Sequence, residues 1–146
     1  MPTALTDLPL NTDPRRKRWT RAEYEELSAV TLSQERLELV DGESISKKGR
    51  KRPHVNALIL LQGWLGRVFG VRFVHPGAPI DVAPQDNPAS EPEPDLIVTS
   101  RDLSHFPAKN PQPADLLLVV EIANTTLGFD LTVKARLYAR AGIADY

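Results

Sequence analysis

Apolar residues recur with helical spacing between Pro53 and Phe69, in the longest periodic stretch of the chain. They fall at i, i+3 and i+4 positions, which places them along one side of a helix. We therefore predict a helix over residues 53–69 that covers the core. Its expected apolar stripe consists of Val55, Leu58, Ile59, Leu65 and Phe69, widened by Leu61, Trp64 and Val68.

Short apolar runs of strand type flank this helix. Before it, residues 36–45 contain Asp41-Gly42 between two such runs, a pattern that favours a hairpin with a primed turn. After it, we expect strands at 71–75, 78–82 and 96–98. Residues 116–122 are apolar without a break until Glu121, which is typical of a central strand buried on both faces. We expect this strand to lie beside 96–98.

Helix signals mark the two ends of this pattern. Thr20 and Glu23 have the spacing of a capping box, which predicts a helix to about residue 28. Asp130 is a natural N-cap for a helix over 131–141, and Gly142 suits its C-terminal end. The order of elements predicts an α/β fold with a mixed β-sheet flanked by helices.

Composition limits the function classes. A length of 146 residues predicts one domain, over 19–146, after a flexible basic arm at 1–18. The net charge of −1 excludes a polycation that binds nucleic acid indiscriminately. The absence of cysteine excludes disulfides and thiolate chemistry, and the three histidines lack metal-ligand spacing, so any metal should be held by oxygen. No signal peptide and no apolar run of membrane length is visible, so we expect a cytoplasmic protein without a membrane partner.

Positive charge is concentrated in two places. The arm ends in four consecutive cations at 15–18, which either form a solvated tail or contact phosphates. The second cluster directly precedes the long helix, where it is either a solvated loop or a nucleic-acid contact. It consists of Lys47, Lys48, Arg50, Lys51 and Arg52.

Two carboxylates lie at the ends of apolar runs. Asp95 precedes the run 96–98 and Glu121 comes near the end of 116–122. Buried carboxylates need a cationic partner, and a divalent metal with oxygen ligands suits two converging acids. Lys134, on the following helix, would handle anionic charge nearby. Together these residues indicate phosphodiester cleavage.

Each of these residues also has a structural interpretation. Glu121 could form a buried ion pair, Asp95 could merely begin a strand, and Lys134 could extend outward or pair with Asp130. Glu38 alternates with Leu37 and Leu39, which favours an exposed strand position over a site acid. His54 is either a capping residue, the interpretation we favour, or a neighbour of the site.

Several pieces in this order resemble the Uma-type restriction endonucleases, a group within the PD-(D/E)XK nuclease superfamily. The resemblance spans residues 19–146. It is carried by 37–43, His54, 94–98, 118–122, Asp130 with Lys134, 137–138 and 141–146.

The resemblance implies a restriction-endonuclease-like core and hydrolysis of phosphodiester bonds in DNA. Asp95 and Glu121 would hold Mg²⁺ or Mn²⁺ with the Ile122 carbonyl, Lys134 would be the catalytic lysine, and Glu38 would be an acid near the site. The superfamily's usual lysine position is Ala123 here, so the lysine would have moved to the next helix. A homodimer stays open.

Three departures accompany the resemblance. Asn124-Thr125-Thr126 stands where relatives often have Ser-Pro-Ser-Thr, and the basic run replaces a loop expected to be rich in proline and serine. Relatives also continue beyond the position of Tyr146 with a further strand, so we expect that C-terminal strand to be missing and a sheet edge to be exposed.

Two other functions remain compatible with the sequence. The first is a catalytically inactive domain of the same fold that only binds nucleic acid. The second is a subunit-interaction domain in which the acids and the lysine form a buried ion network. Dependence on a divalent metal separates both from a nuclease.

Overall fold

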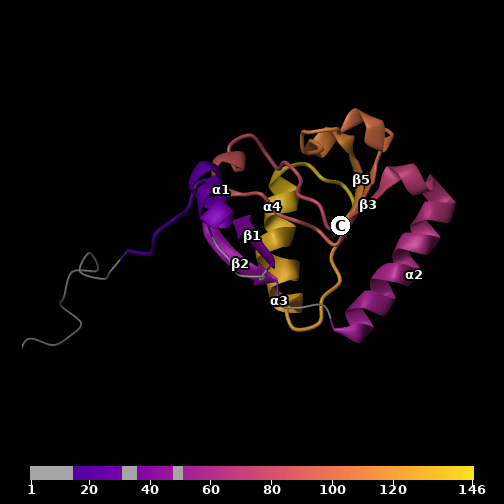
Figure 1. The fold of residues 1–146 in the computed structure, drawn as a ribbon, viewed down its shortest axis with the longest axis horizontal. Helices are drawn as coiled ribbons and strands as arrows, with labels where there is room; N and C mark the ends of the chain where they lie inside the picture. Colours follow the sequence, from indigo (N-terminus) through magenta and orange to yellow (C-terminus); the bar gives the residue numbers. More distant parts are fainter. Residues whose placement is uncertain (1–14, 31–35, 48–50) are drawn as a thin grey trace, which may run out of the picture.

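The computed structural model describes residues 15–30, 36–47 and 51–146, which form an α/β domain with two small sheets (Figure 1). The N-terminal helices are α1 (Arg21–Val30) and α2 (Arg52–Phe69). The strands are β1 (Arg36–Val40), β2 (Glu43–Lys47), β3 (Val74–Pro76), β4 (Leu96–Thr99) and β5 (Leu116–Val120). A C-terminal helix is built from α3 (Leu127–Phe129), η7 (Asp130–Lys134) and α4 (Ala135–Arg140).

The hairpin predicted around Asp41-Gly42 is confirmed. Strands β1 and β2 pair antiparallel, with Val40 opposite Glu43. Asp41 and Gly42 both have left-handed backbone angles, with φ of 49° and 78°, as a type I′ turn requires. A side chain at Gly42 would approach Arg18 to 3.0 Å, so glycine also makes room for the chain segment that precedes α1.

The second sheet has the order β3-β4-β5, and both of its pairings are antiparallel. The expected pairing of 96–98 with 116–122 is confirmed, but the central strand is β4, all of whose residues are buried. Strand β5 ends at Val120 and lies at the edge of the sheet, with Leu117 exposed. The α/β class is confirmed, while two antiparallel sheets replace the mixed sheet we predicted.

The strand expected at 78–82 does not form. Ile80 and Val82 are buried, but the Ile80 amide donates to the Pro92 carbonyl and the Asp81 amide to the Pro111 carbonyl. Pro79 has no amide hydrogen to give to a strand neighbour. The apolar pattern in this stretch therefore indicates burial, but the buried segment is irregular and not a strand. The strand expected at 71–75 is likewise shortened to β3 by a 3₁₀ turn, η3 (Val71–Phe73).

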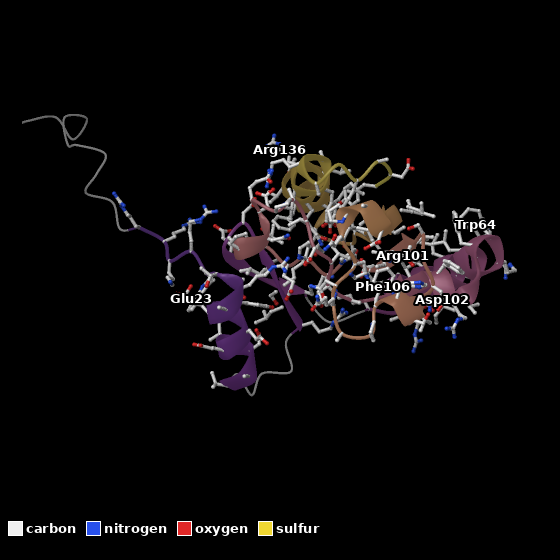
Figure 2. The ribbon with its side chains drawn as sticks, turned by 90° about the horizontal axis from the view of Figure 1, so that it is seen from above. Glu23, Trp64, Arg101, Asp102, Phe106 and Arg136 are labelled. Carbon is white, nitrogen blue, oxygen red and sulfur yellow. The ribbon has the colours of Figure 1, made fainter. Side chains whose placement is uncertain are left out.

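Helix α2 is confirmed over its predicted length, but it covers the core with one side only. Leu58 and Leu65 pack with Val74, Leu96 and Val98 of the second sheet. Most of the remaining expected stripe is exposed, namely Ile59, Trp64, Val68 and Phe69. Figure 2 shows Trp64 at the end of the molecule opposite Glu23 of α1. The predicted stripe was too wide because two apolar faces adjoin on this helix.

The C-terminal helix begins at Leu127 rather than after Asp130. Asp130 has helical angles, so its predicted role as N-cap is wrong. Residues Asp130–Lys134 form a π-helical turn, and Gly142 ends the helix with φ of 76°, as expected. Leu137 and Tyr138 pack in one cluster with Val40 of β1 and Val119 of β5, which places α4 between the hairpin and the second sheet (Figure 1).

Residues 15–18 of the predicted arm are described, and Arg18 donates a hydrogen bond to the Asp41 carbonyl (2.6 Å). Residues 1–14 lie outside the described part of the chain. Within that part, no helix is both long enough and apolar enough to cross a bilayer.

Candidate functional site

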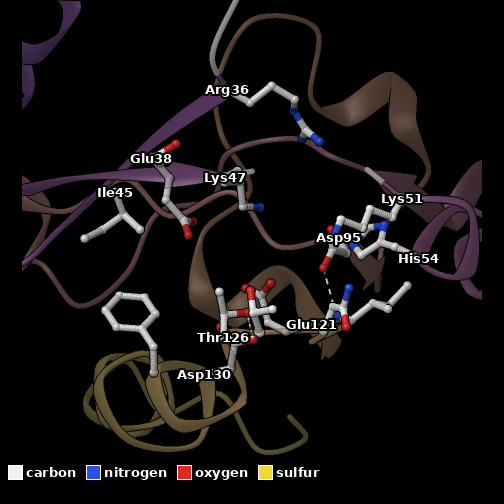
Figure 3. A pocket seen from close by; sticks show the side chains of 15 residues that line it. Arg36, Glu38, Ile45, Lys47, Lys51, His54, Asp95, Glu121, Thr126 and Asp130 are labelled. Atoms are coloured by element: carbon white, nitrogen blue, oxygen red, sulfur yellow. Dashed lines mark hydrogen bonds and ion pairs between the residues drawn. The ribbon is translucent and has the colours of Figure 1, made fainter. Parts of the chain in front are cut away.

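A cavity of about 180 Å³ opens where the hairpin, the start of α2, the start of β4 and the C-terminal helix meet (Figure 3). Four acids line it, namely Glu38, Asp95, Glu121 and Asp130. Three cations line it as well, namely Arg36, Lys47 and Lys51. Figure 3 shows Arg36 and Lys47 reaching in from the hairpin, across from Glu121 and Asp130.

The pocket unites most of the residues that the sequence indicated, including Ile122. Of the basic run, Lys47 and Lys51 line the pocket, and Lys47 donates to the Glu93 carbonyl. Arg52 is exposed and is not part of the lining. Lys48 and Arg50 lie outside the described residues.

Asp95 is held in place by two contacts. It directly precedes β4, and the pairing of Leu96 with Val120 brings it beside the residues that follow β5. Its Oδ2 accepts a hydrogen bond from the Ile122 amide (2.7 Å), and its Oδ1 lies 3.3 Å from His54 Nε2. The side chain is 8% exposed. Asp95 therefore presents a buried carboxylate of fixed orientation to the pocket.

Lys134 lies between Glu38 and Glu121. Its Nζ donates to both carboxylate oxygens of Glu38 (3.1 and 3.0 Å) and forms an ion pair with Glu121. Tyr138, one turn further along the helix, donates its hydroxyl to Glu121 Oε1 (2.8 Å). Lys134 is fully buried, so it does not extend into solvent, and its ion-pair partners are Glu38 and Glu121 rather than the Asp130 that the sequence suggested.

The prediction from strand alternation that Glu38 is exposed is wrong. It is 3% exposed, and its Oε2 also accepts the Glu93 amide (2.9 Å). Alternation correctly separates it from Leu39, but Lys134 of the C-terminal helix covers the face of β1 that was expected to be solvated. Glu38 is thus a buried acid that lines the pocket.

The charges of Lys134, Glu38 and Glu121, which we call the buried charge cluster, do not balance. Burial would lower the pKa of Lys134, but Glu121 and Glu38 outweigh it and raise that pKa, which keeps the ammonium charged. Burial raises the pKa of Glu121 to about 7, although Lys134 opposes the shift. Two ionised carboxylates and one ammonium leave a net negative charge in a buried place. A proton or a further cation therefore stabilises the cluster near neutral pH.

The donor set suits a hard divalent cation. Asp95 and Glu121 offer carboxylate oxygens from the same pocket, and Mg²⁺ is commonly held by one or two carboxylates together with water and substrate oxygens. In the described ranges no three Asp, Glu or His side chains form a ready metal cluster. The pocket therefore suits a site in which one or two protein carboxylates bind the ion, and water and substrate oxygens complete its coordination. It does not suit a site in which protein ligands alone surround the ion.

Three lining residues were missed or misassigned by sequence reasoning. His54 contacts Asp95, so it is a neighbour of the site, against the capping role that we favoured. Its Nδ1 is a buried atom without a hydrogen-bond partner, the one such side-chain atom in the described part of the chain. Asp130 lines the pocket and accepts from the Thr126 hydroxyl (3.0 Å). Arg36 could have been found, because it lies two residues before Glu38 and shares its strand face.

The raised pKa of Glu121 predicts how stability depends on pH without metal. The carboxyl binds its proton more tightly in the folded state, where its pKa is about 7, than in the unfolded chain, where it is near 4.5. The contribution of this carboxyl to the free energy of unfolding is therefore at its maximum below about pH 4.5 and is lost as pH rises towards 7. We expect wild type to lose up to about 1.4 kcal/mol per pH unit over this window relative to Glu121→Gln. Urea unfolding of both proteins from pH 4.5 to 8 measures the difference, and a pH-independent difference contradicts the assignment.

Comparison with known families adds one match. Residues 21–146, from the first residue of α1 to Tyr146, match the Uma2 family, which is described as "Putative restriction endonuclease". No curated protein matches the chain.

Proposed function

This chain belongs to the Uma2 family, and we propose that it is a metal-dependent endonuclease that hydrolyses phosphodiester bonds in DNA. The family itself indicates nuclease function. The observation that carries the finer proposal is the pocket, in which the buried acids Asp95 and Glu121 face a space also lined by Arg36, Lys47 and Lys51. An acidic centre with a cationic rim suits a divalent cation bound together with a polyanion.

Asp95 and Glu121 would hold the metal. A bound divalent cation supplies charge neutralisation for the phosphate and lowers the pKa of a bound water. The Ile122 amide and His54 fix the orientation of Asp95, because they contact its two oxygens. The Ile122 carbonyl is the third ligand that the family resemblance implies, and we keep it as part of the proposal.

Lys134 and Tyr138 fix Glu121. Both donate to this carboxylate from successive turns of one helix, so it is oriented before any ligand binds. Lys134 holds its proton because two carboxylates raise its pKa. Its charge keeps two acids in a buried place, and stabilises anionic charge that develops beside Glu121 during phosphodiester cleavage.

The cationic rim would bind the DNA backbone without reading its sequence. We expect Lys47→Gln with Lys51→Gln to weaken binding to duplex DNA and to reduce the slope of log K against log salt by about 2. Filter binding or fluorescence anisotropy between 50 and 200 mM salt would measure both. Lys109→Gln with Arg136→Gln is the matched control, because both residues are exposed and neither lines the pocket. An equal effect of the two pairs would show that the rim is only a solvated surface.

One observation favours a non-catalytic member of the family as the second candidate. Lys134 already neutralises much of the charge on Glu38 and Glu121, as in a structural ion network. The two candidates differ in their response to metal. A structural network predicts that stability does not depend on a divalent cation and that DNA is not cleaved with or without one.

Cleavage of supercoiled plasmid tests the proposed activity directly. With Mg²⁺ or Mn²⁺ we expect nicked and linear products from wild type, and none with EDTA or from Asp95→Asn. Asp95→Asn keeps the size of the side chain and removes the charge that would hold the metal. Plasmid that stays intact with every divalent cation, although the protein binds DNA, would assign this chain to the non-catalytic candidate.

A further inference from the structure

Helix α2 presents a second apolar face on the side turned away from the sheet. Leu60 is 73% exposed and Trp64 is 54% exposed, although both are large apolar residues. Ile59, Val68 and Val71 are exposed beside them, along the same helix and its following turn. We call these five residues the α2 outer face. Figure 1 shows α2 at one edge of the molecule, with no other element on its outer side.

The α2 outer face is large enough to be an interface. The exposed fractions of its five side chains amount to on the order of 500 Å² of apolar surface. A standard interface buries about 800 Å² per partner, of which somewhat more than half is apolar. An apolar patch of this size is near the upper end of what monomeric proteins leave in water, and patches of this kind are often functional. The face therefore fits a partner of standard size.

Gly63 points to a helix as the element that covers this face. It lies in the interior of α2, beside Ile59, Leu60 and Trp64, where glycine weakens a helix relative to alanine. A Cβ built on Gly63 meets no atom within 4 Å, so no contact within the described residues requires glycine. An exposed glycine in an apolar helix face lets a second helix approach closely.

The charge on this face favours a second copy of the same chain. Arg67 is the one charged residue among the exposed positions of the helix from Asn56 to Val68. If two copies of α2 cross antiparallel at Gly63, their Arg67 residues lie on opposite sides of the crossing, about 12 Å apart along the axis. That separation exceeds the Debye length of about 8 Å at physiological salt, so the charges do not oppose the contact. A twofold pairing therefore matches apolar surface to apolar surface and glycine to glycine.

We propose that the chain forms a homodimer through the α2 outer face, with two copies of α2 crossing near Gly63. The pocket lies beyond this face, at the start of α2, where Lys51 and His54 line it. Both pockets of the dimer therefore stay open. The dimer stands independently of the proposed catalytic function, because neither the face nor its test involves metal or DNA.

Light scattering coupled to gel filtration tests the dimer over a range of protein concentrations. We expect wild type to elute as a dimer, and Leu60→Lys with Trp64→Lys to raise the dissociation constant by roughly 30-fold or more. Leu131→Lys is the matched control, because Leu131 is equally exposed but lies on the C-terminal helix. Circular dichroism checks that the variants are folded.

Cross-linking locates the contact even if a charged variant fails to fold. The chain has no cysteine, so Gly63→Cys introduces a single thiol. Oxidation should join two copies at this position, since a disulfide requires Cα atoms within about 7 Å, whereas Leu131→Cys should form the same dimer but stay free of the cross-link under the same treatment. A monomeric wild type, or a dimer that resists the Leu60 and Trp64 changes and does not cross-link at position 63, would overturn the proposal and leave the face to a different partner.

Discussion

Lys134→Met is expected to destabilise the protein by roughly 3–5 kcal/mol at pH 8 and to reduce plasmid cleavage by about two orders of magnitude or more. The reason is that Lys134 is fully buried and contacts both Glu38 and Glu121. Methionine keeps most of the volume but leaves two buried carboxylates without a cation. Urea unfolding and a plasmid time course measure the two effects.

The same variant should respond strongly to metal. Because both acids remain, a divalent cation can take over part of the neutralisation, so Mn²⁺ should stabilise Lys134→Met more than wild type. Lys109→Met is the control, since Lys109 is exposed and its loss should change stability by less than about 0.5 kcal/mol. Unchanged cleavage by Lys134→Met would mean that the lysine is structural and that another cation serves the site.

Glu121→Gln is expected to lose both metal binding and cleavage. The amide has nearly the same shape and still accepts the Tyr138 hydroxyl, which donates to Glu121 Oε1 in wild type. It lacks the charge that holds a divalent cation, so cleavage should fall by roughly two orders of magnitude or more, the scale for a lost electrostatic group in an active site. Calorimetric titration with Mn²⁺ and the plasmid assay measure the two losses.

Glu23→Gln is the matched control for this substitution. Glu23 belongs to the capping box at the start of α1, contacts Thr20 and Lys17, and is not part of the pocket lining. Its loss should leave Mn²⁺ affinity and cleavage unchanged. Full activity in Glu121→Gln would exclude this carboxylate as a metal ligand and would direct attention to Glu38 and Asp130, the other acids that line the pocket beside Asp95.

The sequence predicted the single helices and turns of this fold better than it predicted which strands pair with one another. The Asp41-Gly42 turn and helix α2 depend on local rules, namely left-handed turn angles and helical spacing, and both are confirmed. The run 116–122 was placed at the centre of the sheet because an apolar run indicates burial but not which strand pairs on each side. The pattern at 78–82 failed for the same reason, since burial of Ile80 and Val82 comes without strand pairing.

The candidate site was predicted in its members but not in its contacts. Asp95 and Glu121 stood out as acids at the ends of apolar runs, and the structure places both in one pocket. Lys134 contacts Glu38, a residue 96 positions away in the sequence, and no periodic pattern predicts a contact over that separation. A capping role was predicted for His54 because polar residues are common at the start of a helix. Its contact with Asp95 appears only when α2 packs beside β4.

Binding of Mn²⁺ to the metal-free protein tests the central claim most directly, because it needs neither DNA nor turnover. Titration followed by electron paramagnetic resonance at pH 8 should show saturable binding to wild type, strongly weakened binding to Asp95→Asn and to Glu121→Gln, and wild-type binding to Glu23→Gln. Equal Mn²⁺ binding by all four proteins, or none by wild type, would contradict a metal site built on these two acids.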